Sequence, residues 1–171
     1  ERQARLETFA VYSGFPKHLF RLGAGYYDAN QYKVTDVQNY GTNPATGLPL
    51  PPGSPLVDLS NTPYAFTKQG KRNSGYLSLQ DAWTLANDWE LTAGIRYDNY
   101  SDFGGTTNPR LALVWQPRRD FTSKLMCGKA FRAPSFLELY SINNPVREGN
   151  PNLKPEVINT WELAFDYRAT Q

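Results

Sequence analysis

Long runs in which apolar and polar residues alternate are the main feature of this sequence. The clearest run, WELTAGIRYDNY from Trp89 to Tyr100, places Trp89, Leu91, Ala93, Ile95 and Tyr97 on one face. Successive side chains of a β-strand point to opposite faces, so this alternation predicts a strand with one apolar face. The run is about twice the usual length of a strand in a soluble sheet. It is near the roughly nine to eleven residues of a tilted strand that spans a membrane.

Similar patterns predict further strands on both sides of this run. Two lie upstream of residue 30, around a Gly/Pro turn at 14–17, and the others lie downstream. Asp81 interrupts the apolar face of one of them. Together with 89–100, the pattern predicts about seven strands, the other six being 3–13, 18–29, 76–85, 110–115, 121–131 and 160–167.

The predicted connections alternate between short and long. Short turns lie at 14–17, 87–88 and 117–120, whereas long polar connections lie at 31–74, 101–107 and 132–158. Short periplasmic turns and longer extracellular loops are typical of outer-membrane barrels. The longest connection is rich in Pro, Gly, Asn and Thr, a composition that also suits a flexible linker between domains.

The four tryptophans fit the same orientation. Trp83, Trp89 and Trp115 lie beside predicted short turns, and we expect Trp161 near the opposite rim. Membrane barrels carry girdles of aromatic residues at both interfaces with water. The alternative is that these residues belong to the core of a soluble sheet.

Composition narrows the function classes. No run of 18 or more apolar residues exists to form a transmembrane helix, although the two faces of a barrel strand cancel in any hydropathy average. One histidine, His18, and one cysteine, Cys127, argue against a disulfide framework, a Cys/His metal site and a catalytic thiol. Lys and Arg are scattered, which does not indicate nucleic-acid binding. We expect no cofactor and no bound metal, and the start at Glu1 shows no signal peptide pattern.

From about residue 74 to 168 the sequence resembles the barrel of TonB-dependent outer-membrane receptors, the group that includes siderophore, haem, cobalamin and colicin receptors. The order and spacing of several blocks together carry the resemblance. These blocks are LTAGIRYDNYSDFG at 91–104, NPRLALVW at 108–115, GKAFRAPSFLELY at 128–140, GNPNLKPE at 149–156 and TWELAFDY at 160–167.

The resemblance implies an all-β fold, with antiparallel up-and-down strands that form part of a 22-stranded transmembrane barrel. It also implies the outer membrane of a Gram-negative bacterium, contact with its lipid, and uptake of a metal chelate such as a siderophore, haem or cobalamin. In such receptors a plug domain fills the barrel and energy arrives through TonB. The chain lacks the plug, so the TonB complex would be contacted by regions missing from it. The implied role is transport, and an enzyme is not expected.

Four charged residues are predicted to face the lumen. Arg96 and Asp98 lie on the polar side of the strand 89–100, and Arg110 and Glu162 on neighbouring strands are candidate partners. An inward charge meets a polar lumen, whereas an outward charge costs kilocalories in lipid. We expect these four to form a structural network in the lumen.

Ligand contacts are expected in the long loops. Ligand sites combine apolar surface with a few polar groups, which favours aromatic and polar residues at the mouth of the barrel. The candidates are Tyr64, Phe66, Phe103, Tyr140, Arg147 and Asn152. Turn capping is the alternative role for Asn152, within GNPNLKPE.

Other classes of protein share parts of this pattern. A passive porin would have the same two-faced strands. A barrel hydrolase would need a Ser–His pair, for which His18 offers poor support on the predicted periplasmic side. A soluble β-sandwich would instead bury the apolar faces of two sheets against each other.

Overall fold

The computed structural model describes residues 1–144 and 146–169. The chain divides into two compact units, which we call the sheet unit and the loop unit. The sheet unit comprises Arg5–Tyr27, Asn73–Arg132 and the described residues from Pro155 onward. The loop unit comprises Glu1–Ala4, Asp28–Arg72 and Ala133–Lys154.

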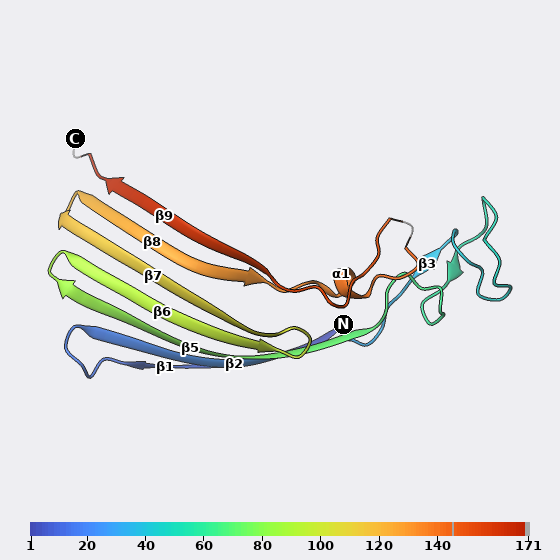
Figure 1. Cartoon of the computed structure of the whole chain (residues 1–171), viewed down its shortest axis with the longest axis horizontal. Helices are drawn as coiled ribbons and strands as arrows, with labels where there is room; N and C mark the ends of the chain where they lie inside the picture. The colour runs from blue at the N-terminus through green and yellow to red at the C-terminus, as the bar shows by residue number, and fades with distance from the viewer. Residues whose placement is uncertain (145, 170–171) are drawn as a thin grey trace. The chain divides into compact units, whose positions relative to one another are not determined.

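One seven-stranded sheet contains all the long strands, and it keeps their order along the chain (Figure 1). The four ladders from β5 to β9 are antiparallel. The strands are thus joined as an up-and-down meander, as the alternating pattern predicted. They are β1 (Arg2–Tyr12), β2 (His18–Gln31), β5 (Gly70–Ala86), β6 (Trp89–Tyr100), β7 (Gly104–Arg118), β8 (Phe121–Arg132) and β9 (Glu156–Tyr167).

The register gives the sheet two chemically different faces. Residues directly opposite each other in a ladder point to the same side, so a row can be followed across strands. One row from β5 to β9 is entirely apolar and consists of Trp83, Leu91, Leu113, Leu125 and Leu163. A row on the other face consists of Gln80, Gly94, Arg110, Gly128 and Thr160. We call these the apolar face and the polar face.

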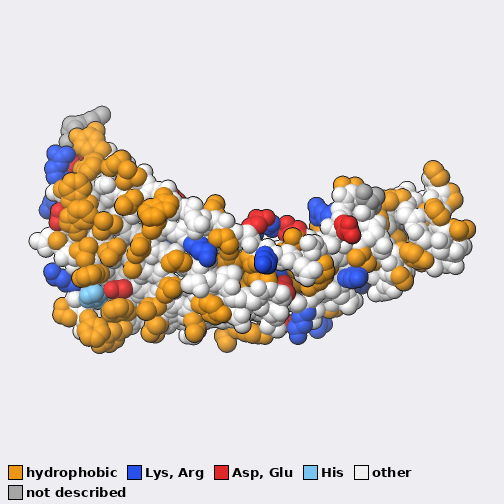
Figure 2. Space-filling model, viewed as in Figure 1, with side chains coloured by type: hydrophobic (Ala, Val, Ile, Leu, Met, Phe, Trp, Pro, Cys, Tyr) orange, Lys and Arg blue, Asp and Glu red, His pale blue; other side chains and the backbone are white. Residues whose placement is uncertain are grey.

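The apolar face is open. Leu163 is 63% exposed and Ile95 is 50% exposed. Figure 2 shows hydrophobic side chains gathered over the strands near the short turns. A β-sandwich would have buried these side chains under a second sheet, so the sandwich alternative is wrong. Such a large apolar surface requires an apolar environment.

The predicted connection at 101–107 is wrong. β6 ends at Tyr100 and β7 begins at Gly104, so only three residues join them. Gly104 has a φ of +84°, a conformation that glycine adopts without steric cost. The two glycines at 104 and 105 interrupt the period-two pattern. The first residues of β7 could therefore not be recognised from the sequence. β5 similarly begins at Gly70, before the predicted end of the 31–74 loop.

Three of the four tryptophans lie where the sequence placed them. Trp89 is directly opposite Trp115, their rings stack at a centroid distance of 5.6 Å, and Trp83 lies one row away, opposite Leu91. The indole N–H of Trp115 donates to Asp88 in the adjacent short turn at 3.1 Å. The prediction for Trp161 is wrong, because Trp161 pairs with Cys127 midway along β9 and not at a rim.

The loop unit has a small core of its own. It contains the short ladder of β3 (Val37–Gln38) with β4 (Val57–Asp58) and the helix α1 (Phe136–Tyr140). Its buried hydrophobic residues are Ala29, Leu59, Ala65 and Leu139. The helix was not predicted, although its sequence SFLE carries a signal. Ser135 and Glu138 form a capping box, in which each side chain binds the backbone N–H of the other.

Candidate functional site

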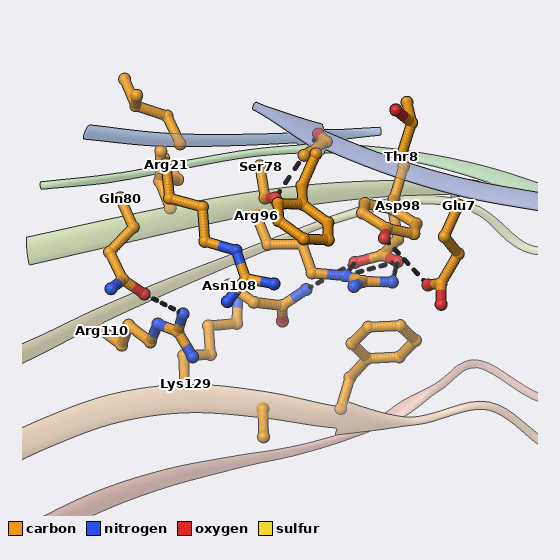
Figure 3. Close-up of a pocket in the computed structure, with 17 residues that line it drawn as sticks. Glu7, Thr8, Arg21, Ser78, Gln80, Arg96, Asp98, Asn108, Arg110 and Lys129 are labelled. Atoms are coloured by element: carbon orange, nitrogen blue, oxygen red, sulfur yellow. Dashed lines mark hydrogen bonds and ion pairs between the residues drawn. The ribbon is translucent and has the colours of Figure 1, made fainter. Parts of the chain in front are cut away.

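A depression on the polar face is the main concave feature of the sheet unit. It has a volume of about 610 Å³ and is lined by residues of six strands, β1, β2, β5, β6, β7 and β8 (Figure 3). Its lining carries four cationic and two anionic side chains, which are Arg21, Arg96, Arg110, Lys129, Glu7 and Asp98. The depression is therefore a charged site with a cationic excess.

Asp98 is the most enclosed charged residue of the depression. It is 2% exposed, and both of its carboxylate oxygens accept hydrogen bonds from Arg96, at 2.7 to 2.9 Å. Arg96 and Asp98 are two residues apart on β6, which puts both on the polar face. The Arg96 guanidinium also lies 3.6 Å from the centre of the Tyr76 ring. Paired, bidentate geometry of this kind fixes the position of the arginine.

The second carboxylate is also engaged. Glu7 of β1 accepts a hydrogen bond from the Tyr76 hydroxyl at 2.8 Å and forms an ion pair with Arg5 at 2.9 Å. Tyr76 therefore links β1 to the Arg96–Asp98 pair across the polar face. Both acidic side chains of the depression are held by partners from the sheet itself.

Two of the other three cations contact neutral groups. Arg110 donates a hydrogen bond to the Gln80 side chain, and the Arg21 guanidinium lies 4.8 Å from the centre of the Phe9 ring. Lys129 enters the depression from β8 (Figure 3). Within residues 1–144 and 146–169, no carboxylate forms an ion pair with Arg21, Arg110 or Lys129.

The four charges predicted for the lumen do not form one cluster. Arg96 and Asp98 pair with each other, while Arg110 turns to Gln80. Glu162 lies opposite Met126 and lines a separate depression of about 220 Å³, which Arg110 also lines. Arg110 thus lies between the two groups.

The loop unit is held together around Arg72. Its guanidinium donates to the carbonyl of Pro134 at 2.7 Å and lies 5.2 Å from the centre of the Phe136 ring. The Tyr140 ring stacks on Phe136 at 6.0 Å, and both rings lie so close to Gly70 that a Cβ there would meet them at 2.7 to 3.0 Å. These contacts fix α1 against the start of β5.

The loop residues predicted to contact ligand differ in their surroundings. Tyr64, Phe66 and Tyr140 are half-buried in the loop unit, where the Phe66 ring contacts Tyr40. Arg147 and Asn152 are exposed in the same unit, whereas Phe103 belongs to the sheet unit and stacks on Tyr100 at 4.4 Å. Their contact with a ligand stays a prediction.

One ionisable group of the loop unit has a shifted pKa. Hydrogen bonds from the Ser60 side chain and backbone hold the pKa of Asp58 below its ordinary value. A lowered pKa means that Asp58 favours folding while it is ionised, and that this contribution is lost only as the pH falls through the lowered value. Asp58 is thus expected to stay ionised, and to keep this contribution to folding, near neutral pH.

The apolar face contains one polar pair that the sequence analysis missed. His18 Nδ1 lies 2.7 Å from Asp81 Oδ2, and the His18 ring stacks on Trp83 at 5.1 Å and on Phe20 at 5.5 Å. Figure 2 shows the histidine among hydrophobic side chains. The two residues are 63 positions apart, so His18 looked isolated. The feature of the sequence that could have indicated this pair is Asp81, because it interrupts an otherwise apolar strand face.

No helix in the described ranges is both long and apolar enough to cross a membrane. The same ranges hold no group of three or more His, Cys, Asp or Glu side chains arranged to bind a metal ion.

Long two-faced strands, an exposed apolar face and a charged opposite face define the wall of a membrane-spanning sheet with a polar interior. The family model described as "TonB dependent receptor-like, beta-barrel" matches residues 3–171, and the chain belongs to this family. It is part of the β-barrel of an outer-membrane protein.

Individual relatives agree with this assignment. The chain is 35% identical over 77 residues to the vitamin B12 transporter BtuB of Vibrio cholerae serotype O1, covering 45% of the chain and 12% of that protein. It is 36% identical over 118 residues to a hemin receptor of Yersinia pestis, covering 56% of the chain and 17% of that protein. The chain therefore spans only a small part of these relatives.

A solved structure shares the fold. The siderophore receptor PirA from Pseudomonas aeruginosa matches 98% of the chain and 28% of its own length, with a TM-score of 0.68 and 23% identity. At this identity the match supports the fold alone. It does not assign a ligand.

Proposed function

We propose that the complete protein is an outer-membrane receptor that takes up a metal chelate, with an iron siderophore or haem as the favoured ligand, by TonB-driven active transport. The observation that carries this proposal is the match of residues 3–171 to the TonB-dependent receptor-like barrel family. The two-faced sheet agrees with it, because its open apolar face suits lipid and its charged face suits a water-filled interior. We propose transport in place of catalysis, in keeping with the receptor family that the chain matches.

The loop unit is proposed as part of the extracellular mouth. Residues 31–74 and 132–158 supply most of it, and it is organised by its own buried residues, Leu59 and Leu139 among them. A packed loop presents side chains in fixed positions, which lowers the entropic cost of binding a ligand. This supports a recognition role for the long connections.

Within the mouth, we assign ligand contact to the six aromatic and polar residues named above. Arg147 and Asn152 are exposed and offer charge and hydrogen bonds, whereas Tyr64, Phe66 and Tyr140 offer partly buried ring surface. Phe103 lies in the sheet unit and is proposed as a ligand contact independently of the other five. Chelates of iron combine anionic oxygens with apolar rings or chains, which suits such a mixture.

Uptake by whole cells tests the function. Cells that express the complete receptor are supplied with a labelled ferric siderophore, haem or cobalamin, in strains with and without TonB. We expect accumulation of one chelate only when TonB is present. Accumulation that persists without TonB, together with passage of unrelated sugars, would instead support the passive porin.

Binding by variants tests the site. We expect Tyr140→Ala and Arg147→Ala to weaken chelate binding to the purified complete receptor by more than about 1 kcal/mol each, as central binding residues do. Arg119→Ala, in the short turn after β7, is the matched control and should leave affinity unchanged. Unchanged affinity for the first two variants would remove them from the site.

A further inference from the structure

Three of the four cationic side chains of the depression form no ion pair within the described residues. The two carboxylates, Glu7 and Asp98, are each held by an arginine and a further donor. Arg21, Arg110 and Lys129 line the same depression, where Arg110 donates to Gln80 and Arg21 lies over the Phe9 ring. Three positive charges that share one hollow repel each other, and a bound anion would offset that repulsion.

The rest of the lining supports binding of a group of defined chemistry. Arg110 is held by Gln80 and Arg21 by Phe9, so both guanidinium groups are oriented before anything binds. Asn108 donates to Asp98 and Thr106, while its Oδ1 is buried and has no partner within the described ranges. The hollow therefore offers several cationic donors and one unused acceptor.

We propose that this depression is an anion-binding site in the interior of the barrel, which takes a carboxylate or a similar oxyanion through Arg21, Arg110 and Lys129. The inference rests on the proposed function, because the polar face becomes an interior surface only when the strands close into a barrel. Guanidinium groups bind carboxylates in bidentate geometry, and a lysine adds a point charge. The buried Asn108 oxygen favours an anion that also carries a donor, such as a hydroxyl or amide N–H.

The carboxylate can come from two sources with the same chemistry. One source is an acidic side chain of a protein segment that enters the interior. The other is a small anionic solute that passes through it. The volume of about 610 Å³ accommodates either one.

Solute binding is measured by calorimetry on the purified complete receptor in detergent at low salt, with tricarballylate, a small tricarboxylate, as the probe. If the anion is a solute, we expect Arg21→Gln/Lys129→Gln to lower its affinity at least about tenfold, equal to about 1.4 kcal/mol. Lys124→Gln is the matched control, because Lys124 is on the same strand and outside the depression. Affinity for the control should stay within about twofold of wild type.

Carbodiimide coupling identifies a protein source. This reagent joins an amine to a carboxylate in direct contact with it, and peptide mass spectrometry then locates the bond. If the anion belongs to the receptor, we expect Lys129 to be coupled to an acidic residue outside residues 1–171, and Lys124 not to be coupled. The Lys129→Arg receptor should fold normally and lack that bond.

The proposal fails if two results occur together. Lys129 forms no such bond, and tricarballylate binds the wild-type receptor and the double variant equally. Absence of binding to both proteins counts as equal binding. The outcome is separable from the uptake test. If the receptor imports no chelate but binds the probe through Arg21 and Lys129, the anion site stands and the proposed function fails. If the receptor imports a chelate with TonB but shows neither probe binding nor a Lys129 cross-link, the anion site fails and the proposed function stands.

Discussion

The loop unit and the sheet unit use their apolar residues in opposite ways. Every hydrophobic residue that is buried in the described chain belongs to the loop unit, whereas the sheet unit buries only Asp98. The loop unit is organised like a small soluble domain, with apolar atoms inside. The sheet unit places its apolar atoms outside and its most enclosed group is a charge, so its surroundings must supply the burial that a core would provide.

Removing a core side chain from the loop unit gives the largest expected effect. Leu59 is fully buried, and Leu59→Ala should destabilise the loop unit by about 2–5 kcal/mol through lost burial and a cavity. Hydrogen exchange of the complete receptor measures this as faster exchange across residues 28–72. The exposed Leu56→Ala is the control, and equal effects of both variants would contradict a core around Leu59.

Charging the apolar face is expected to have the next largest effect. Leu163→Arg in the complete receptor should cost about 2–4 kcal/mol in a bilayer if this position lies near the midplane. Unfolding by denaturant from lipid vesicles gives the free energy. Thr160→Arg on the same strand points to the polar face and should cost much less. Similar costs for both would mean that the two faces meet the same solvent.

Removing the helix cap gives the smallest expected effect. Ser135→Ala deletes the side chain that accepts from the backbone N–H of Glu138, and should destabilise α1 by about 0.5–2 kcal/mol. Hydrogen exchange at residues 136–142 detects the loss. Glu138→Gln retains a capping box and should be close to wild type. An unchanged Ser135→Ala would show that tertiary contacts alone hold the helix.

Much of the sheet was predictable because alternation reports directly on a two-faced strand. β6 was predicted to the residue, since its apolar and polar positions alternate without interruption. Gly104 and Gly105 concealed the start of β7 because a glycine carries no side chain to mark a face. The helix α1 was missed because five residues are too few to display a helical period, although its capping box was present.

For the candidate site, the sequence predicted which face of the sheet a residue lies on, but not which side chain it contacts. The sequence places Arg96, Asp98 and Arg110 on the polar side, and their register agrees. It does not show that Arg96 pairs within its own strand while Arg110 turns to Gln80, because side-chain rotamers decide this. Arg21 and Lys129 were missed because strands β2 and β8 reach the depression only through the fold.

Side chains that radiate from the apolar face have no fixed neighbours to fit. A residue in a close-packed core must match its surroundings in volume and shape, but Leu163 or Ile95 needs only to be compatible with fluid hydrocarbon. Many apolar residues satisfy that condition equally well, so substitutions can accumulate there without altering the backbone. Such freedom is compatible with a shared fold at low identity, as in the siderophore receptor PirA, on which the chain superimposes with a TM-score of 0.68 at 23% identity.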